Sequence, residues 1–98
     1  MNQQVMLRKL QKMQKEMMEA QERLENTVFT GTAGGGVVKV EVKGSHEVIS
    51  VTIDEEAAKD DIEMVQDMIV LAINDANKKI EAETQKSLGG FGAGMGLF

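Results

Sequence analysis

The chain has 98 residues, a formal net charge of −5 and no cysteine, so it is long enough for one domain but cannot hold disulfide bonds or cysteine-ligated metals. Its single histidine excludes a histidine-rich zinc site within one chain. No apolar run approaches the roughly 20 residues of a transmembrane helix, and the N-terminus lacks the uninterrupted apolar core of a secretory signal, so we expect a cytoplasmic protein without a membrane partner.

Residues 3–26 have the pattern of a long helix with one apolar side. Apolar side chains recur at alternating spacings of four and three residues, which is a heptad seam. The seam consists of Met6, Leu10, Met13, Met17, Ala20 and Leu24. The first fifteen residues contain four basic side chains and no acid: Arg8, Lys9, Lys12 and Lys15. Lys12 and Lys15 each have an acid four residues later, with which they can form an ion pair along the helix. These two lysines could therefore belong to an ordinary solvent-exposed helix face instead of a binding site.

The length of this helix predicts an oligomer. A helix over residues 3–26 is about 36 Å long, whereas strands of six or seven residues span only about 20 Å. The helix therefore extends past its own sheet and leaves part of its apolar seam uncovered. We expect a second copy to cover that seam, in a homodimer with two-fold symmetry.

Three strands are predicted in the centre of the chain. Val38, Val40 and Val42 alternate with polar residues, as in a strand with one buried face. The segment from Ile49 to Ile53 alternates in the same way, and we expect it to bury its apolar side too. Residues 28–33 form a further strand, with turns expected at the glycines 34–36 and at residues 44–47. The result is a three-stranded antiparallel sheet.

A second long helix is predicted from Asp61 to about Lys86. Asp60 has the position of an N-cap with Glu63 three residues later, and residues 54–58 before it are expected to form a turn. Gly89 is expected to end the helix. We therefore expect one dimerising domain over residues 1–88 and a flexible glycine-rich tail over residues 89–98.

No pattern in the chain indicates catalysis. His46, the only histidine, lies in an expected turn without a cysteine or a serine elbow to activate. The three glycines 34–36 precede a strand rather than a helix, which does not fit a phosphate-binding loop. We therefore expect neither an enzyme nor a cofactor or metal.

Several segments, in this order and spacing, resemble the YbaB/EbfC family of nucleoid-associated bacterial proteins. They are the N-terminal Met/Lys/Gln-rich helix, AGGGVVKVEVKGSHEVISVTID over residues 33–54 and EMVQDMIVLAINDANKKIE over residues 63–81. The resemblance implies an α+β chain of the order α-β-β-β-α and a tweezer-like homodimer. It also implies binding of double-stranded DNA in the nucleoid, with effects on DNA conformation and gene expression.

The sequence thus favours a homodimeric DNA-binding protein. The candidate DNA-binding residues are Arg8, Lys9, Lys12, Lys15, Lys39, Lys43, Lys78 and Lys79. The candidate interface residues are Met6, Leu10, Met13, Met17, Leu24, Val40, Val42, Ile69 and Ile73. The alternative hypothesis is a protein-interaction module whose methionine-rich and acidic surfaces bind a protein of a replication or recombination complex.

Overall fold

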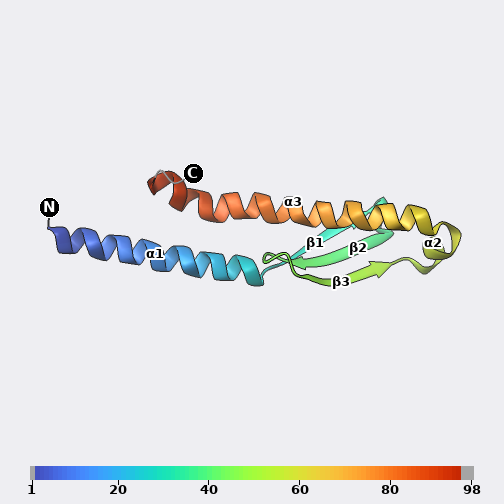
Figure 1. The fold of residues 1–98 in the computed structure, drawn as a ribbon, viewed down its shortest axis with the longest axis horizontal. Helices are drawn as coiled ribbons and strands as arrows, with labels where there is room; N and C mark the ends of the chain where they lie inside the picture. The colour runs from blue at the N-terminus through green and yellow to red at the C-terminus, as the bar shows by residue number, and fades with distance from the viewer. Residues whose placement is uncertain (1, 96–98) are drawn as a thin grey trace.

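The computed structural model describes residues 2–95, and their side chains as far as residue 89. The chain is α+β, with one long helix, three strands and two further helices in that order, as the sequence predicts. It measures 70 × 20 × 15 Å, with a radius of gyration of 19.2 Å, whereas a compact chain of this size has a radius of about 13 Å. Figure 1 shows the reason, since the first helix leads away from the sheet instead of folding back over it.

Helix α1 spans Gln3–Asn26, which confirms the predicted helix. The Asn2 side chain caps its first turn by accepting a hydrogen bond of 2.9 Å from the backbone N–H of Gln4. At the other end the hydroxyl of Thr27 donates to the carbonyl oxygen of Arg23 at 2.7 Å. Thr27 itself is extended, so the chain passes directly from the helix into the sheet.

The sheet consists of β1 (Val28–Ala33), β2 (Val38–Lys43) and β3 (Val48–Ile53). The strands are antiparallel in the order β1-β2-β3, which confirms the predicted topology. The three glycines between β1 and β2 form a 3₁₀ turn, η1 (Gly34–Gly36), with φ values of 63°, 67° and 102°. Only glycine adopts these values without steric cost, so this sequence is what the turn requires.

The core lies between one face of the sheet and the last helix, α3 (Ile62–Met95). Val38, Val40 and Val42 of β2 are fully buried against α3, as their alternation predicts. β3 differs from the expectation of a strand with one buried face, because Ile49 and Val51 are 48% and 44% exposed. The physical reason is the position of α3, which packs mainly on β1 and β2, so the apolar side of the third strand is left uncovered.

The segment between the sheet and α3 is a short helix, α2 (Glu55–Asp60), and not the turn expected at residues 54–58. The N-cap prediction is also wrong by one residue. It is Asp61 whose carboxylate accepts the backbone N–H of Met64 at 3.1 Å. Asp60 is the last residue of α2, and the chain bends at Asp61 between the two helices.

Helix α3 continues past Lys86 to Met95, so the expectation that it ends at Gly89 is wrong. Glycine ends a helix by adopting positive φ, and among the glycines that the structure describes only Gly34, Gly35 and Gly36 have a positive φ. Residues 96–98 of the expected tail lie outside the described residues. The division into a domain over residues 1–88 and a flexible tail stays a prediction.

Candidate nucleic-acid interface

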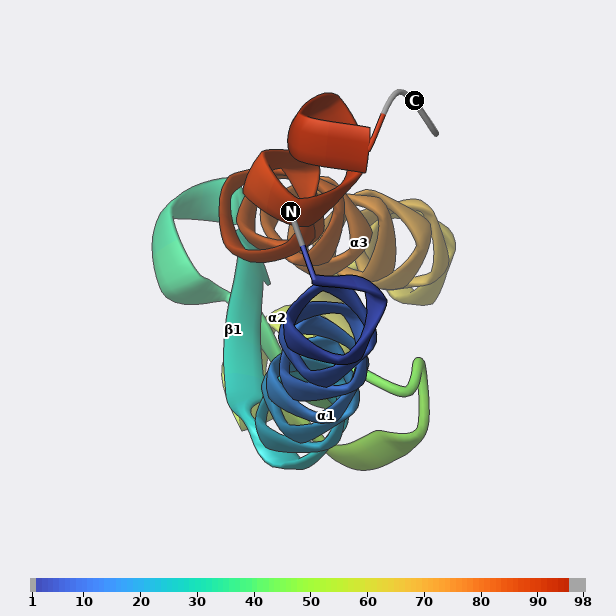
Figure 2. The ribbon, with the colours of Figure 1, turned by 90° about the vertical axis from the view of Figure 1, so that its left-hand side faces the viewer.

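Helix α1 forms an arm that projects beyond the sheet, as its length predicts (Figure 1). The exposure of its apolar seam falls steadily toward the sheet. Met6 and Leu10 near the tip are 56% and 46% exposed, whereas Ala20 and Leu24 are 7% and 8% exposed. The C-terminal half of α3 lies beside the base of the arm (Figure 2), and the tip of the seam is uncovered.

The base of the arm is held by Gly44, in the turn between β2 and β3. The backbone N–H of Gly44 donates to the carbonyl oxygen of Thr27 at 2.9 Å. A Cβ atom at position 44 would overlap the carbonyl oxygen of Leu24. The turn and the last turn of α1 therefore approach each other as closely as only glycine allows, which fixes where the arm leaves the sheet.

The arm carries the basic side chains predicted to bind DNA. Arg8, Lys9, Lys12 and Lys15 are all exposed. Lys12 lies 3.9 Å from Glu16, with both side chains largely exposed, and such a pair is worth little in water. Within the described residues the other three make no ion pair. At about 100° per residue, Arg8, Lys12 and Lys15 share one side of the helix, so three cations of the arm point in a common direction.

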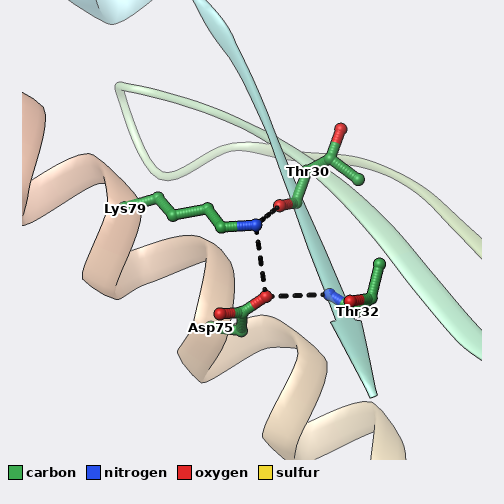
Figure 3. Close-up of polar contacts among 4 residues, drawn as sticks. All are labelled: Thr30, Thr32, Asp75 and Lys79. Carbon is green, nitrogen blue, oxygen red and sulfur yellow. Dashed lines mark hydrogen bonds and ion pairs between the residues drawn. The ribbon is translucent and has the colours of Figure 1, made fainter. Parts of the chain in front are cut away.

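The other predicted DNA-binding residues lie elsewhere. Lys39 and Lys43 are on β2, where Lys43 is 3.9 Å from Glu47. Lys78 is exposed on α3. The ammonium of Lys79 is already bound, since it donates to the carbonyl oxygen of Thr30 at 2.7 Å (Figure 3). Within one chain, the structure does not bring these four residues together with the basic tip of the arm.

Lys79 belongs to a polar cluster between α3 and β1 that the sequence did not reveal. Asp75, one turn earlier, lies 3.4 Å from the Lys79 ammonium and accepts the backbone N–H of Thr32 at 3.0 Å (Figure 3). The hydrogen bond from Thr32 lowers the pKa of the Asp75 carboxyl below its ordinary value of 3.8; partial burial opposes this, and Lys79 adds to the lowering. The spacing of four residues between Asp75 and Lys79 predicts an ion pair along the helix. It does not predict that both side chains also form hydrogen bonds with the backbone of β1.

The predicted interface residues are of two kinds in the structure. Leu24, Val40 and Val42 are buried inside the chain itself, so they have almost no surface left for a partner. The remaining residues are at least partly exposed: Met6, Leu10, Met13, Met17, Ile69 and Ile73. Further exposed apolar residues lie outside the predicted interface, and they include Val48, Ile49 and Val51 on β3 and Val70 and Leu71 on α3.

A groove of about 760 Å³ separates the base of α1 from the C-terminal half of α3. Its charged lining residues are Glu16, Glu19, Arg23 and Glu83. In the described part of the chain, His, Asp and Glu side chains nowhere form a group of three that could hold a metal ion. His46 pairs with Asn77, with 3.1 Å between its Nδ1 and the amide oxygen. The helices of residues 2–95 include none with the length and apolar character needed to span a membrane.

Comparison with known sequences decides the family. Residues 1–95 match the sequence profile described as the YbaB/EbfC DNA-binding family. The chain belongs to the YbaB/EbfC DNA-binding family. Three similar curated relatives are named nucleoid-associated proteins. The relative from Rickettsia akari (strain Hartford) is 45% identical, over 93% of this chain and 86% of the relative, and the one from Ligilactobacillus salivarius (strain UCC118) is 42% identical, over 91% of this chain and 86% of the relative. The relative from Mycobacterium tuberculosis (strain ATCC 25177 / H37Ra) is 47% identical, over 92% of this chain and 68% of the relative.

A solved structure has the same fold as this YbaB/EbfC chain. It is the crystal structure of an uncharacterized protein from Helicobacter pylori, with a TM-score of 0.70 and 31% sequence identity. The similarity covers 91% of this chain and 94% of the other. These findings confirm the family resemblance and the α-β-β-β-α fold that it implies.

Proposed function

We propose that this YbaB/EbfC protein binds double-stranded DNA as a homodimer in the nucleoid, alters the conformation of the DNA and thereby influences nucleoid organisation and gene expression. The observation that carries the proposal is the arm formed by α1, which bears four exposed cations and no acid as far as residue 15. The family assignment supports DNA as the polyanion that these cations meet.

The distribution of charge accommodates DNA in spite of the net charge of −5. Acidic residues are dense in and around α2, which lies at the opposite end of the molecule from the tip of α1 (Figure 1). This separation exceeds the Debye length of about 8 Å at physiological ionic strength. The acids around α2 therefore repel a duplex at the arm only weakly.

A homodimer strengthens this site by bringing a second arm to the same duplex. Four cations on each arm give eight for the pair, and eight phosphate contacts would give a slope of log K against log salt of about −7. The uncovered apolar side chains of α1, β3 and α3 support a self-association of this kind. Since no helix or ribbon of the chain is identified as reading base edges, we expect binding to depend little on DNA sequence.

The experiment is a gel-shift titration of the full chain with a DNA duplex at several salt concentrations. We expect affinity to fall steeply with salt, and the double variant Arg8→Glu/Lys9→Glu to lose most of it. Single variants allow a matched comparison, in which Arg8→Glu weakens binding and Lys59→Glu on α2 does not. Binding that is insensitive to salt, or equal loss in both single variants, would show that the arm is not the DNA site.

A further inference from the structure

The first half of α1 carries large apolar side chains that are poorly covered. We define the arm tip as residues 3–15 of α1, whose N-terminal end projects beyond both the sheet and α3 (Figure 1). Both buried residues of α1, Ala20 and Leu24, lie at its base. Four apolar side chains of the arm tip are 41–56% exposed: Val5, Met6, Leu7 and Leu10. DNA binding does not account for them, because counter-ion release depends on the cations alone.

Apolar and basic side chains lie on opposite sides of the arm tip. At about 100° per residue, the apolar side covers about 120° of the helix. In order around the helix it consists of Met13, Met6, Leu10 and Leu7. The four cations occupy the opposite sector, and the arm tip contains no acid. This division, with an apolar side and a basic polar side, is typical of helices that lie in the surface of a membrane.

Leu7 distinguishes a membrane surface from a partner helix as the covering group. The heptad seam of α1 includes Met6 and Leu10 but not Leu7, which lies about 60° further around the helix than Leu10. A partner helix covers chiefly the narrow seam, which leaves Leu7 at its margin. Leu7 is nevertheless as exposed as Met6, at 55% and 56%. A continuous apolar medium covers the whole apolar side, including Leu7.

We propose that the arm tip binds the surface of a membrane that contains anionic phospholipids. The helix lies along the surface with its apolar side toward the acyl chains, and its cations contact the headgroup phosphates. Each Lys or Arg near an anionic surface strengthens binding about fivefold. The expectation of no membrane partner rests on the lack of a spanning segment, and a helix that lies on the surface needs no such length.

The charges of the remaining chain confine the contact to the arm tip. Residues 16–26 of α1 contain four acids and one base, so an anionic surface repels this half of the helix. The acids around α2 lie at the opposite end of the molecule (Figure 1). Met18 is 65% exposed in the acidic half and lies within about 20° of Leu7 around the helix, three turns further along. Met18 is therefore a matched control for Leu7.

The test is co-sedimentation of the full chain with lipid vesicles. One set contains equal parts of phosphatidylcholine and phosphatidylglycerol, and the other contains phosphatidylcholine alone. We expect the chain to bind the anionic vesicles far more tightly, with an affinity that falls as salt is added. Leu7→Gln should weaken this binding at least about threefold, because it removes a side chain that leaves water on binding, whereas Met18→Gln leaves it unchanged. Leu, Met and Gln have similar helix propensities, and circular dichroism checks that both variants fold.

Gel shifts with the same variants distinguish lipid binding from DNA binding. Leu7→Gln should keep the affinity of the wild type for a DNA duplex, since it removes no charge. Arg8→Glu/Lys9→Glu should lose both the duplex and the anionic vesicles, because the two ligands use the same cations. A wild-type chain that binds the duplex but not the anionic vesicles overturns the lipid proposal and leaves the proposed function intact.

Two further outcomes would overturn the proposal. Equal loss of vesicle binding in Leu7→Gln and Met18→Gln would show that the arm tip is not the lipid-binding segment. If Leu7→Gln instead binds vesicles like the wild type and has a lower molar mass in analytical ultracentrifugation, a second copy covers the arm tip. Loss of vesicle binding in Leu7→Gln alone, with unchanged molar mass and DNA affinity, supports the binding of the arm tip to the lipid surface.

Discussion

The ammonium of Lys79 donates to the carbonyl oxygen of Thr30 at 2.7 Å, across 49 positions of the sequence. The bond connects the middle of α3 to the edge of β1, beside the carboxylate of Asp75 (Figure 3). It ties the last helix to the first strand at the place where the sheet would otherwise present unpaired backbone groups. The stability and the assembly of the chain should both depend on it.

Substitution of Asp75 should lower stability and change assembly. Asp75→Ala leaves the backbone N–H of Thr32 without its acceptor and Lys79 without its counter-charge. We expect a lower melting temperature in circular dichroism and, because the edge of β1 opens, species larger than those of the wild type in ultracentrifugation. Asp67→Ala on the same helix is the control and should leave both measurements unchanged. A variant Asp75→Ala that melts and sediments like the wild type would contradict the role of this contact.

The contribution of Asp75 should depend on pH with a definite sign. Its pKa is below the ordinary value of 3.8 in the folded chain, chiefly because the N–H of Thr32 binds the charged form. The unfolded chain therefore binds the proton more readily, and folding gains stability from Asp75 at pH values above 3.8. This gain is lost as the pH falls through the lowered pKa. We expect the difference in unfolding free energy between the wild type and Asp75→Asn to be constant from pH 7 to about 5 and to shrink below about pH 4.

The sequence predicted most element boundaries because local patterns determine them. The valines of β2 alternate with polar residues, and the seam of α1 keeps its spacing from Met6 to Leu24, so the sequence predicts both elements correctly. The sequence predicts Asp60 as the N-cap of α3, whereas Asp61 caps the helix, because two adjacent aspartates offer the same chemistry. The predicted end of α3 is wrong because glycine is the residue type typical of a helix end, but Gly89 does not adopt the positive φ that ends a helix.

The candidate site was predictable only in part, because some of its properties come from long-range contacts. The basic first half of α1 follows from its residues alone. That Lys79 is bound to Thr30, and that Val51 is uncovered, depends on where α3 crosses the sheet. The alternation of β3 predicts an apolar side, but it contains no information on whether the covering surface belongs to the same chain or to another.

Substitution of Gly31 should separate steric exclusion from backbone strain. A Cβ atom at position 31 would overlap the carbonyl oxygen of Ala72 and lie 2.7 Å from the backbone nitrogen of Ala76. Since neither backbone atom can move alone, Gly31→Ala should lower the unfolding free energy by about 3 kcal/mol or more. Gly35→Ala is the control, because the φ of 67° at this position is unfavourable for alanine but the added Cβ atom would meet nothing within 4 Å. For Gly35→Ala we expect the unfolding free energy to fall by about 1–2 kcal/mol. Equal losses in urea unfolding at one protein concentration would contradict the close packing of β1 on α3.

Neutralisation of a single lysine on α1 should reduce the salt dependence of DNA binding in proportion to the number of phosphate contacts that are lost. Lys12 and Lys15 lie on the same side of the arm, and each occurs twice in a homodimer. If Lys15 contacts phosphate in both arms, Lys15→Gln removes two contacts and makes the slope of log K against log salt shallower by about 1.8. The sheet variant Lys43→Gln, whose ammonium lies 3.9 Å from Glu47, should leave the slope unchanged. Filter-binding titrations between 50 and 200 mM salt, a range over which several phosphate contacts change affinity by orders of magnitude, measure both slopes. A slope that changes with Lys43 and not with Lys15 would move the DNA from the arm to the polar face of the sheet.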